Sequence, residues 1–351
     1  MSTKVSGFTE EELEYYSRQM VMKGFGVEGQ RRLKGAKVCV VGLGGLGSPV
    51  SIQLATMGVG HLRIIDRDVV DISNLHRQHL YGVDVVGYPK AEVAAERLSR
   101  LNPHVTVEPM PVSVTPSNAE RLIQGMDLVV DCLDSMAPRY SLNRGCVKFG
   151  IPMIHGAVIT QIGNATTIIP GETVCLECFQ GGLEDDSLPS CAVVGVHPSI
   201  IGIVASIQVS EVVKLLLGRT PSLKNTLLFC DLSDLSFERI TLARMENCPV
   251  CGSEPRSKPT PIRYEPLHEI CGREGRRVFV FDPDEDADID LIALNRSLEE
   301  QGFDIEVRAK LGVTFSRGPV KGSVLLSGVT ILEGMNSRDE ATRLHDAIVN
   351  P

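Results

Sequence analysis

The feature that most constrains this chain is a glycine turn between two apolar segments. The turn, Gly-Leu-Gly-Gly-Leu-Gly at 42–47, follows an apolar run at 36–41 and precedes an apolar segment at 48–57. A strand, a tight turn and the start of a helix in this order direct main-chain N–H groups and the positive end of the helix dipole at a phosphate. The glycines expected to form this cradle are Gly42, Gly44, Gly45 and Gly47. The turn alone is weak evidence, because many α/β domains contain one.

Polar and charged residues follow the turn at positions expected near a bound nucleotide. They are Asp66, Asp68, Asn74, Arg77, Gln78 and Lys90. A carboxylate at the end of the second strand would accept hydrogen bonds from ribose hydroxyls, whether the ligand were NAD or ATP. Arg77 and Lys90 favour ATP, because cleavage at the α-phosphorus requires cations aimed at oxygens that gain charge as pyrophosphate leaves. The sequence has no Walker-type GxxxxGK[ST], so these two residues are expected to supply that charge.

Asp134 follows directly after an expected strand at 127–133. The carboxyl ends of parallel strands face the ligand crevice, so this carboxylate is predicted to hold Mg²⁺ on the phosphates. Asp131, earlier on the same strand, either supports that site or is simply buried at the strand end.

Short apolar strands alternate with helical periods along the chain, which implies a parallel sheet with helices on both faces. Strands are predicted at 36–41, 61–66, 105–110, 127–133, 153–158 and 164–169, and helices at 48–57, 90–101, 117–124, 138–149 and 200–217. The N-terminal part, 8–35, is expected to be helical, and 227–242 to form a hairpin. The predicted fold class is α/β: a Rossmann-like, mostly parallel sheet with an antiparallel extension, plus a small C-terminal α+β domain.

The domain boundary is predicted after the last cysteine pair. Residues 1–252 are expected to form the ATP-binding domain, 253–266 a proline-rich linker that behaves as a stiff spacer, and 267–351 the small α+β domain, whose role the sequence leaves open. Within the small domain, strands are expected at 277–281, 303–307 and 324–332, and helices at 289–300 and 338–349.

Composition excludes several classes of protein. A net charge of −9 argues against a general nucleic-acid surface, which needs a basic face. The N-terminus is acidic where a secretory signal would be apolar. The most apolar helical segment, 200–217, is interrupted by Gln208, Glu211 and Lys214, so it is predicted to be a buried helix and not a membrane span. A cytoplasmic protein without nucleic-acid or membrane partners is expected.

Four of the ten cysteines form two CxxC pairs, Cys175/Cys178 and Cys248/Cys251. Disulfides are rare in cytosolic proteins, and two such pairs have the spacing of a four-cysteine zinc site. Thioredoxin-like redox chemistry is the alternative, but that motif would occur once. A structural Zn²⁺ is therefore predicted. Four other cysteines lie in apolar segments and are expected to be small buried hydrophobic residues: Cys39, Cys132, Cys146 and Cys230.

Cys191 differs from the other cysteines, because it lies in a polar segment, 181–195, that is expected to cross over the site. An exposed thiol near a cationic site could form a thioester or a persulfide. The alternative is an incidental loop cysteine.

Together these residues resemble the MoeB/ThiF/HesA family, the bacterial and archaeal relatives of ubiquitin-activating enzymes. The resemblance covers about residues 8–252. Its motifs are Tyr16-Ser17-Arg18-Gln19, the glycine turn, Asp66-Arg67-Asp68, the Asn74-x-x-Arg77-Gln78 run, Gly87-Tyr88-Pro89-Lys90, Asp134, Arg139 and both CxxC pairs. The resemblance implies ATP-dependent adenylation of the C-terminal glycine carboxylate of a small ubiquitin-like sulfur-carrier protein, with release of pyrophosphate. Sulfur transfer in cofactor biosynthesis or tRNA thiolation would follow.

The resemblance also implies partners and residue roles. Arg18 would reach the ATP site of a neighbouring protomer, which implies a homodimer, and would be catalytic together with Arg77, Lys90 and Asp134. Cys191 matches the loop position that some members use for a covalent sulfur or thioester link. Ser135 stands where the family usually has Asn. No rhodanese-like domain follows, so a separate sulfur donor, such as a cysteine desulfurase or a rhodanese, is expected.

Three alternatives stay open at this point. The same nucleotide site could adenylate a small-molecule or tRNA-linked carboxylate. An NAD-dependent oxidoreductase would share the glycine turn but would not need Arg77 and Lys90. A non-enzymatic scaffold could keep the fold, although the intact Arg18, Lys90 and Asp134 argue against it.

Overall fold

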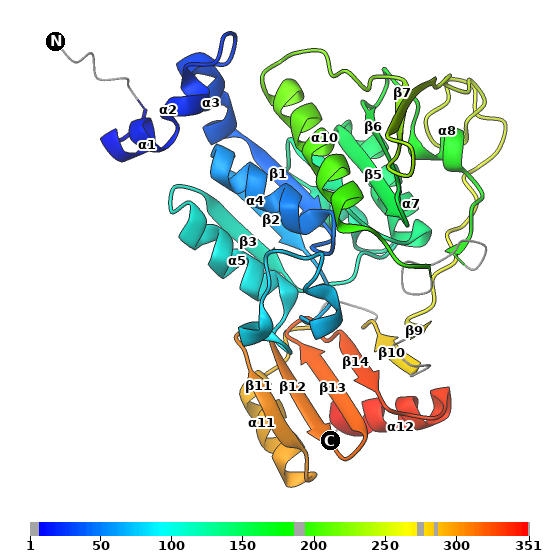
Figure 1. Ribbon diagram of the computed structural model, residues 1–351. Helices are drawn as coiled ribbons and strands as arrows, with labels where there is room; N and C mark the ends of the chain where they lie inside the picture. The colour runs from blue at the N-terminus through cyan, green and yellow to red at the C-terminus, as the bar shows by residue number, and fades with distance from the viewer. Residues whose placement is uncertain (1–6, 186–193, 272–276, 284–286, 350–351) are drawn as a thin grey trace.

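The computed structural model describes residues 7–185, 194–271, 277–283 and 287–349. Two sheets organise the chain, a large one in the N-terminal part and a small one in the C-terminal part (Figure 1). Cys191 lies outside the described residues.

The large sheet has eight strands in the order β3-β2-β1-β4-β5-β6-β7-β8. Its strands are β1 (Lys37–Val41), β2 (His61–Ile65), β3 (Thr106–Met110), β4 (Leu128–Asp131), β5 (Met153–Ile159), β6 (Ile162–Ile168), β7 (Thr226–Asp231) and β8 (Ser236–Thr241). The first five strands are parallel and the last three add an antiparallel extension. The predicted α/β class is therefore confirmed. The direction in which successive strands are added to the sheet reverses between β1 and β4, and folds of this type form their ligand crevice at that point.

Both faces of the parallel strands are covered, which explains why these strands are continuous apolar runs. Along β1, Val38 and Val40 pack into one core, and Cys39 and Val41 pack into the other. The first core contains α3 (Gly26–Gly35), α4 (Gly47–Met57), α5 (Lys90–Leu101) and α10 (Pro198–Leu216), and the second contains α6 (Ala119–Ile123) and α7 (Met136–Phe149). Cys39, Cys132, Cys146 and Cys230 are all buried, as predicted.

The helical N-terminal part is broken into three pieces, α1 (Glu10–Tyr15), α2 (Ser17–Met20) and α3. Gly24 and Gly26 adopt positive φ angles in the turn that leads from α2 into α3, and Gly26 is the first residue of α3. Further short helices that the sequence pattern did not indicate are η1 (Ile72–Asn74), η2 (Val83–Val85) and α8 (Leu176–Gln180).

Among the described residues, α10 is the one helix long and apolar enough to cross a membrane by length and composition. It packs against α4, β5 and β6 in the core (Figure 1). Gln208 and Glu211, both buried, bond inward: the Gln208 amide donates to Asp131 O (2.8 Å), and Glu211 accepts from Thr167 Oγ1 (2.9 Å). These contacts agree with the prediction of a buried helix.

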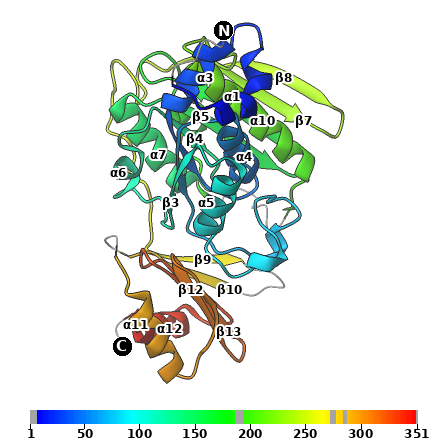
Figure 2. The same cartoon turned by 90° about the vertical axis from the view of Figure 1, so that its left-hand side faces the viewer.

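The small sheet is antiparallel throughout, in the order β11-β12-β13-β14-β10-β9. Its strands are β9 (Leu267–Cys271), β10 (Arg277–Phe281), β11 (Asp304–Arg308), β12 (Gly312–Arg317), β13 (Val320–Leu325) and β14 (Thr330–Glu333). Helices α11 (Leu291–Glu300) and α12 (Arg338–Val349) cover one face (Figure 2). The prediction of a single strand at 324–332 is wrong, because a turn with Gly328 at φ +90° divides this segment between β13 and β14.

Residues 253–266 connect the two parts without regular secondary structure. This segment is pinned to the large part at two points. Arg144 donates to Thr260 O (2.7 Å), and Ile262 packs against the second core. The connection is therefore held in place by contacts, beyond any stiffness that its prolines give it.

Candidate functional site

The glycine turn lies between β1 and α4, at the carboxyl edge of the parallel strands. Gly42 adopts φ +88°, and a Cβ there would lie 2.7 Å from Cys132 O. A Cβ on Gly47 would lie 1.7 Å from Gly42 O, so neither position accepts a larger residue. No side chain among the described residues caps the N-terminus of α4. The N–H of Ser48 bonds back to Gly44 O (3.0 Å) and Pro49 has no N–H, so α4 offers an anion mainly the positive end of its dipole.

Asp66, directly after β2, stabilises this turn through hydrogen bonds to its main chain. One carboxylate oxygen accepts the N–H of Leu43 (2.6 Å) and the other accepts the N–H of Asp68 (2.7 Å). Burial raises the pKa of Asp66 to about 6, although the positive charge of Lys90 opposes the rise. Asp66 thus has a structural task in the turn besides the ribose contact expected from the sequence.

Lys90 is buried at the start of α5, with 4% of its side chain exposed, and its ammonium lies 2.8 Å from Asp68 Oδ2. Burial lowers the pKa of this amine, but the carboxylates of Asp68, Asp66 and Asp134 more than compensate, so the pKa of Lys90 is raised. A buried, charged ammonium beside the carboxylate that follows β2 is suited to a polyanionic ligand. Asp134 is exposed just beyond β4, so the ends of β2 and β4 contribute to the same charged site.

The segment after β2 brings the other predicted polar residues to the turn. Asn74 Oδ1 accepts hydrogen bonds from Arg77 Nη2 (2.8 Å) and from Gln78 Nε2 (3.1 Å), so a single amide orients both side chains. Gln78 is buried and faces Gly44, where a Cβ would lie 3.6 Å from Gln78 Nε2. Tyr81 donates from its hydroxyl to Leu43 O (3.1 Å) and ties this segment to the turn.

A buried charged cluster lies at the end of β4, close to Asp134 in the sequence; two of its members, Asp131 and Arg139, were named from the sequence, but His155 was missed. Asp131 has no exposed surface, and its carboxylate lies 2.7 Å from His155 Nδ1 and 3.4 Å from Arg139 Nε. Arg139 also donates to Leu133 O and to Gly156 O, and it thereby holds the residue preceding Asp134. Burial opposes ionisation of Asp131, but Arg139 and His155 keep the pKa of this carboxyl below its usual range. The register pair Asp131–His155 follows from the pairing of β4 with β5, which the sequence does not reveal.

The start of the crossover segment is anchored on α7. Asp185 accepts the N–H groups of Met136 (2.6 Å) and Ala137 (3.3 Å), at the positive end of that helix. The Tyr140 hydroxyl bonds to the main chain of Gln180 and Leu183. The segment that leads to Cys191 therefore begins beside Asp134, while Cys191 itself lies outside the described residues.

Arg18 is not brought to this site within the chain. It is exposed on α2, and the adjacent Gln19 donates to Met57 O (2.8 Å), at the C-terminal end of α4. The glycine turn lies at the other end of α4. An 11-residue helix spans about 16 Å, so Arg18 and the turn are well separated.

The two CxxC pairs come together as one cluster. The four Sγ atoms lie within 4.8 Å of one another. Three of the separations are 3.9 Å (Cys175–Cys178), 3.7 Å (Cys175–Cys248) and 3.4 Å (Cys178–Cys251). Tetrahedral thiolate coordination of Zn²⁺, with Zn–S bonds of about 2.3 Å, places the sulfurs about 3.8 Å apart. The cluster can therefore hold a metal ion of this kind, and it has no open ligand position.

Comparison with known proteins identifies relatives over most of the chain. The sequence profile of the ThiF family matches residues 16–250. A SAMP-activating enzyme E1 from Haloferax volcanii is 44% identical over 242 residues, which cover 69% of this chain and 89% of the relative. A sulfur carrier protein adenylyltransferase from Thermus thermophilus is 42% identical over 271 residues, which cover 76% of this chain and 98% of the relative. Among solved structures, Escherichia coli MccB with ATP matches with a TM-score of 0.61 and 26% identity, covering 68% of this chain and 74% of MccB.

Proposed function

This chain belongs to the ThiF family, and we propose that it is an adenylyltransferase that activates the C-terminal glycine carboxylate of a ubiquitin-like sulfur-carrier protein. ATP would supply the adenylyl group, and pyrophosphate would leave. The observation that carries the proposal is the buried, charged Lys90 beside the glycine turn, in a chain 42% identical to a sulfur carrier protein adenylyltransferase over nearly all of that relative.

Each site residue has a role in this proposal that its position supports. The glycine turn and the N-terminus of α4 would bind the phosphates, and Asp66 and Asp68 the ribose. Lys90 and Arg77 would stabilise the charge that develops as pyrophosphate departs. Asn74 would position Arg77, to which it is already hydrogen-bonded.

We propose that the chain also binds two metal ions, one for the reaction and one for its structure. Asp134 offers an exposed carboxylate where Mg²⁺ could bind, and Mg²⁺ would supply neutralising charge to the phosphates. The four-cysteine cluster would hold a structural Zn²⁺. In this proposal the Cys191 thiolate would either displace AMP from the carrier's acyl-adenylate to form a thioester, or receive sulfane sulfur from the separate sulfur donor as a persulfide.

We also propose the boundaries and partners that the sequence suggested. The two sheets share no strand, which supports an adenylation domain at 1–252, a linker at 253–266 and a small domain at 267–351. The proposed partners are a second copy of the chain, the carrier, and a separate sulfur donor, in the cytoplasm.

The alternatives are weaker than this proposal. Adenylation of a small-molecule or tRNA-linked carboxylate would use the same nucleotide site, but no contact among the described residues favours it. A nicotinamide-dependent oxidoreductase does not account for the buried cation, and the two relatives described above carry the names of an activating enzyme and an adenylyltransferase.

Pyrophosphate exchange tests the proposed function directly. With a sulfur-carrier protein that ends in Gly-Gly, the chain should incorporate labelled pyrophosphate into ATP, because acyl-adenylate formation is reversible. The matched control is the same carrier with its final glycine removed, which should support no exchange. Exchange with a small acid, and none with any carrier, would contradict the protein substrate.

A mixing experiment tests the proposed homodimer. Arg18→Ala and Lys90→Ala chains should each be inactive, because each loses a cation of the site. If Arg18 acts in the neighbouring protomer, mixed dimers contain one intact site, and random mixing in equal amounts restores about a quarter of the unaltered activity. Activity that stays absent in mixtures shown to exchange subunits would place Arg18 outside the partner's site.

A further inference from the structure

Lys90 is held in place by a short antiparallel pairing of residues 68–70 with residues 87–90, which we name the lysine ladder. Three main-chain hydrogen bonds of 2.8–2.9 Å join its two sides, and the one nearest the site runs from the N–H of Lys90 to Asp68 O. The ladder therefore sets the position of the ammonium relative to the glycine turn. Its outer side faces the small sheet.

Thr314 of the small sheet bonds directly to this ladder. Its hydroxyl donates to Gly87 O (2.6 Å) and also lies 2.7 Å from the hydroxyl of Ser323, its cross-strand partner. Alternation along β12 points Val313 and Phe315 into the core under α11 and α12, and Thr314 toward the opposite face. Only 1% of Thr314 is exposed, so its hydroxyl has no access to water in place of Gly87.

Gly87 itself is fitted to the small sheet. It adopts φ +88°, and a Cβ there would lie 3.0 Å from Val307 Cγ2. Both the backbone angle and the close approach of β11 therefore require glycine at this point of the ladder.

Apolar contacts reinforce the same interface. Val69, in the middle of the ladder, packs against Val280, Leu325 and Val329 of the small sheet. These three residues are almost completely buried. They lie on the face of the sheet that α11 and α12 leave uncovered.

Two carboxylates complete the attachment from either side. Glu92, in the first turn of the helix that begins at Lys90, accepts the N–H groups of Lys310 (3.1 Å) and Leu311 (2.7 Å). The second carboxylate is Asp282, which follows β10.

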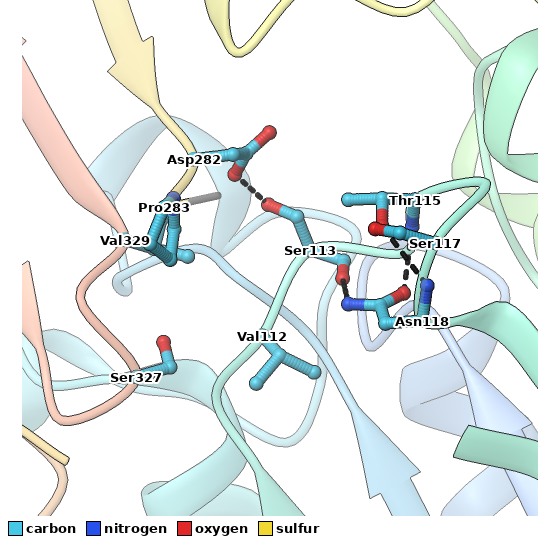
Figure 3. Close-up of a pocket in the computed structure, with 9 residues that line it drawn as sticks. All are labelled: Val112, Ser113, Thr115, Ser117, Asn118, Asp282, Pro283, Ser327 and Val329. Carbon is cyan, nitrogen blue, oxygen red and sulfur yellow. Dashed lines mark hydrogen bonds between the residues drawn. The ribbon is translucent and has the colours of Figure 1, made fainter. Parts of the chain in front are cut away.

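Asp282 links the small sheet to the Asp66–Asp68 turn and to the end of β3. It accepts from Ser113, it lies 3.0 Å from His268 Nε2, and Arg67 Nη1 lies 3.7 Å away. Figure 3 shows Asp282 and Ser113 pointing toward one another across the interface. Burial raises the pKa of Asp282, but His268, Arg67 and the hydroxyl donors more than offset this, so its pKa is lowered and the carboxylate stays charged.

We propose that the small sheet is a built-in support for the nucleotide site, in which Thr314 is a positioning residue that acts on Lys90 through Gly87. The consequence for catalysis rests on the proposed adenylation function, whereas the mechanical coupling does not. The family profile ends at residue 250, before this sheet begins, so the support is a property of this chain beyond the matched family domain.

The test replaces Thr314 with valine, which keeps the shape of the side chain and removes the hydroxyl. Loss of the bond leaves Gly87 O buried without its donor, so hydrogen exchange of the amides in 86–92 should become about tenfold faster. The KM for ATP in pyrophosphate exchange should rise by a similar factor, and the KM for the carrier should stay unchanged. Thr330→Val is the matched control, since Thr330 is equally buried but pairs with Phe281 and Val324 on the helix-covered face.

The outcomes separate the support from the function. If Thr314→Val and Thr330→Val lower the melting temperature alike, and neither changes exchange at 86–92 nor the KM for ATP, Thr314 is merely structural and the proposal fails. If the unaltered chain catalyses no pyrophosphate exchange, the proposed function fails, and hydrogen exchange alone decides for or against the support. Should Thr314→Val not fold, Glu92→Gln breaks the same interface from the other side and should have the same two effects.

Discussion

Replacing Lys90 with methionine is expected to abolish pyrophosphate exchange while leaving the chain folded. Methionine fills a similar volume but has no charge, and the buried ammonium of Lys90 lies 2.8 Å from Asp68 Oδ2. Removal of one pre-positioned donor to developing charge typically costs 10²–10³ in rate, and we expect a fall of about 10³-fold.

A second effect of the same substitution adds to the loss. Burial already raises the pKa of Asp66 to about 6, and the positive charge of Lys90 is the main influence that opposes this rise. Without that charge the pKa of Asp66 should rise further, so the carboxyl becomes protonated near neutral pH. A protonated Asp66 accepts hydrogen bonds less well, which weakens both the Leu43 contact and any ribose contact.

The matched control for this experiment is Lys148→Met. Lys148 makes an exposed ion pair with Glu120 on the outer helices, and such pairs contribute little to stability. Rates should be measured with ATP and carrier saturating, and calorimetric binding of ATP with Mg²⁺ should weaken for Lys90→Met alone. Exchange by Lys90→Met within tenfold of the unaltered chain would remove Lys90 from the reaction.

The sequence predicted those features that local pattern determines. The strands around the glycine turn are apolar runs because both faces are buried, as Val38 to Val41 show, and such runs can be recognised without a structure. The glycines at 42 and 47 are required by contacts within a few residues or with one neighbouring strand. The CxxC spacing likewise indicated that these four cysteines would come together, and their Sγ atoms lie within 4.8 Å of one another.

What the sequence could not predict depends on which elements become neighbours. His155 pairs with Asp131 only because β5 lies beside β4, and neither residue is unusual within its own strand. The boundary between β13 and β14 was missed because the run at 324–332 is apolar on both sides of its turn.

The contact between Thr314 and Gly87 was missed for a related reason. A threonine in a strand is an ordinary residue, and 227 positions separate it from Gly87. Its bond exists because the small sheet docks on the carboxyl edge of the large one, and a pattern confined to one segment contains no information about docking. The Gly87-Tyr88-Pro89-Lys90 motif could be recognised in the sequence, but its hydrogen bond with Thr314 could not.

Removal of the Zn²⁺ that we propose for the four-cysteine cluster is expected to cause the largest loss of stability. The cluster joins Cys175 and Cys178, before and within α8, to Cys248 and Cys251, after β8, so it closes a large loop of chain. Structural Zn²⁺ contributes apparent binding free energies of about 10–16 kcal/mol in small zinc-binding peptides, so even a fraction of that value is large for a domain. We expect the Cys248→Ser chain to melt lower by about 10 °C or more.

The loss of structure should begin in the segment that carries Cys248 and Cys251 and should then extend to the small sheet. Residues 243–252 have no strand or helix of their own, so without the metal they should exchange amide hydrogens rapidly. Elemental analysis should find about one zinc per chain in the unaltered protein, as four thiolate ligands imply, and much less in Cys248→Ser.

The control is Cys230→Ser, which changes an equally buried cysteine that lies in β7, away from the cluster. It should keep its zinc and lose little stability, because one buried sulfur is exchanged for oxygen without loss of a ligand. A metal-free protein that melts at the same temperature as the metal-bound form would show that the four thiols pack stably by themselves, and the structural role of the metal would be wrong.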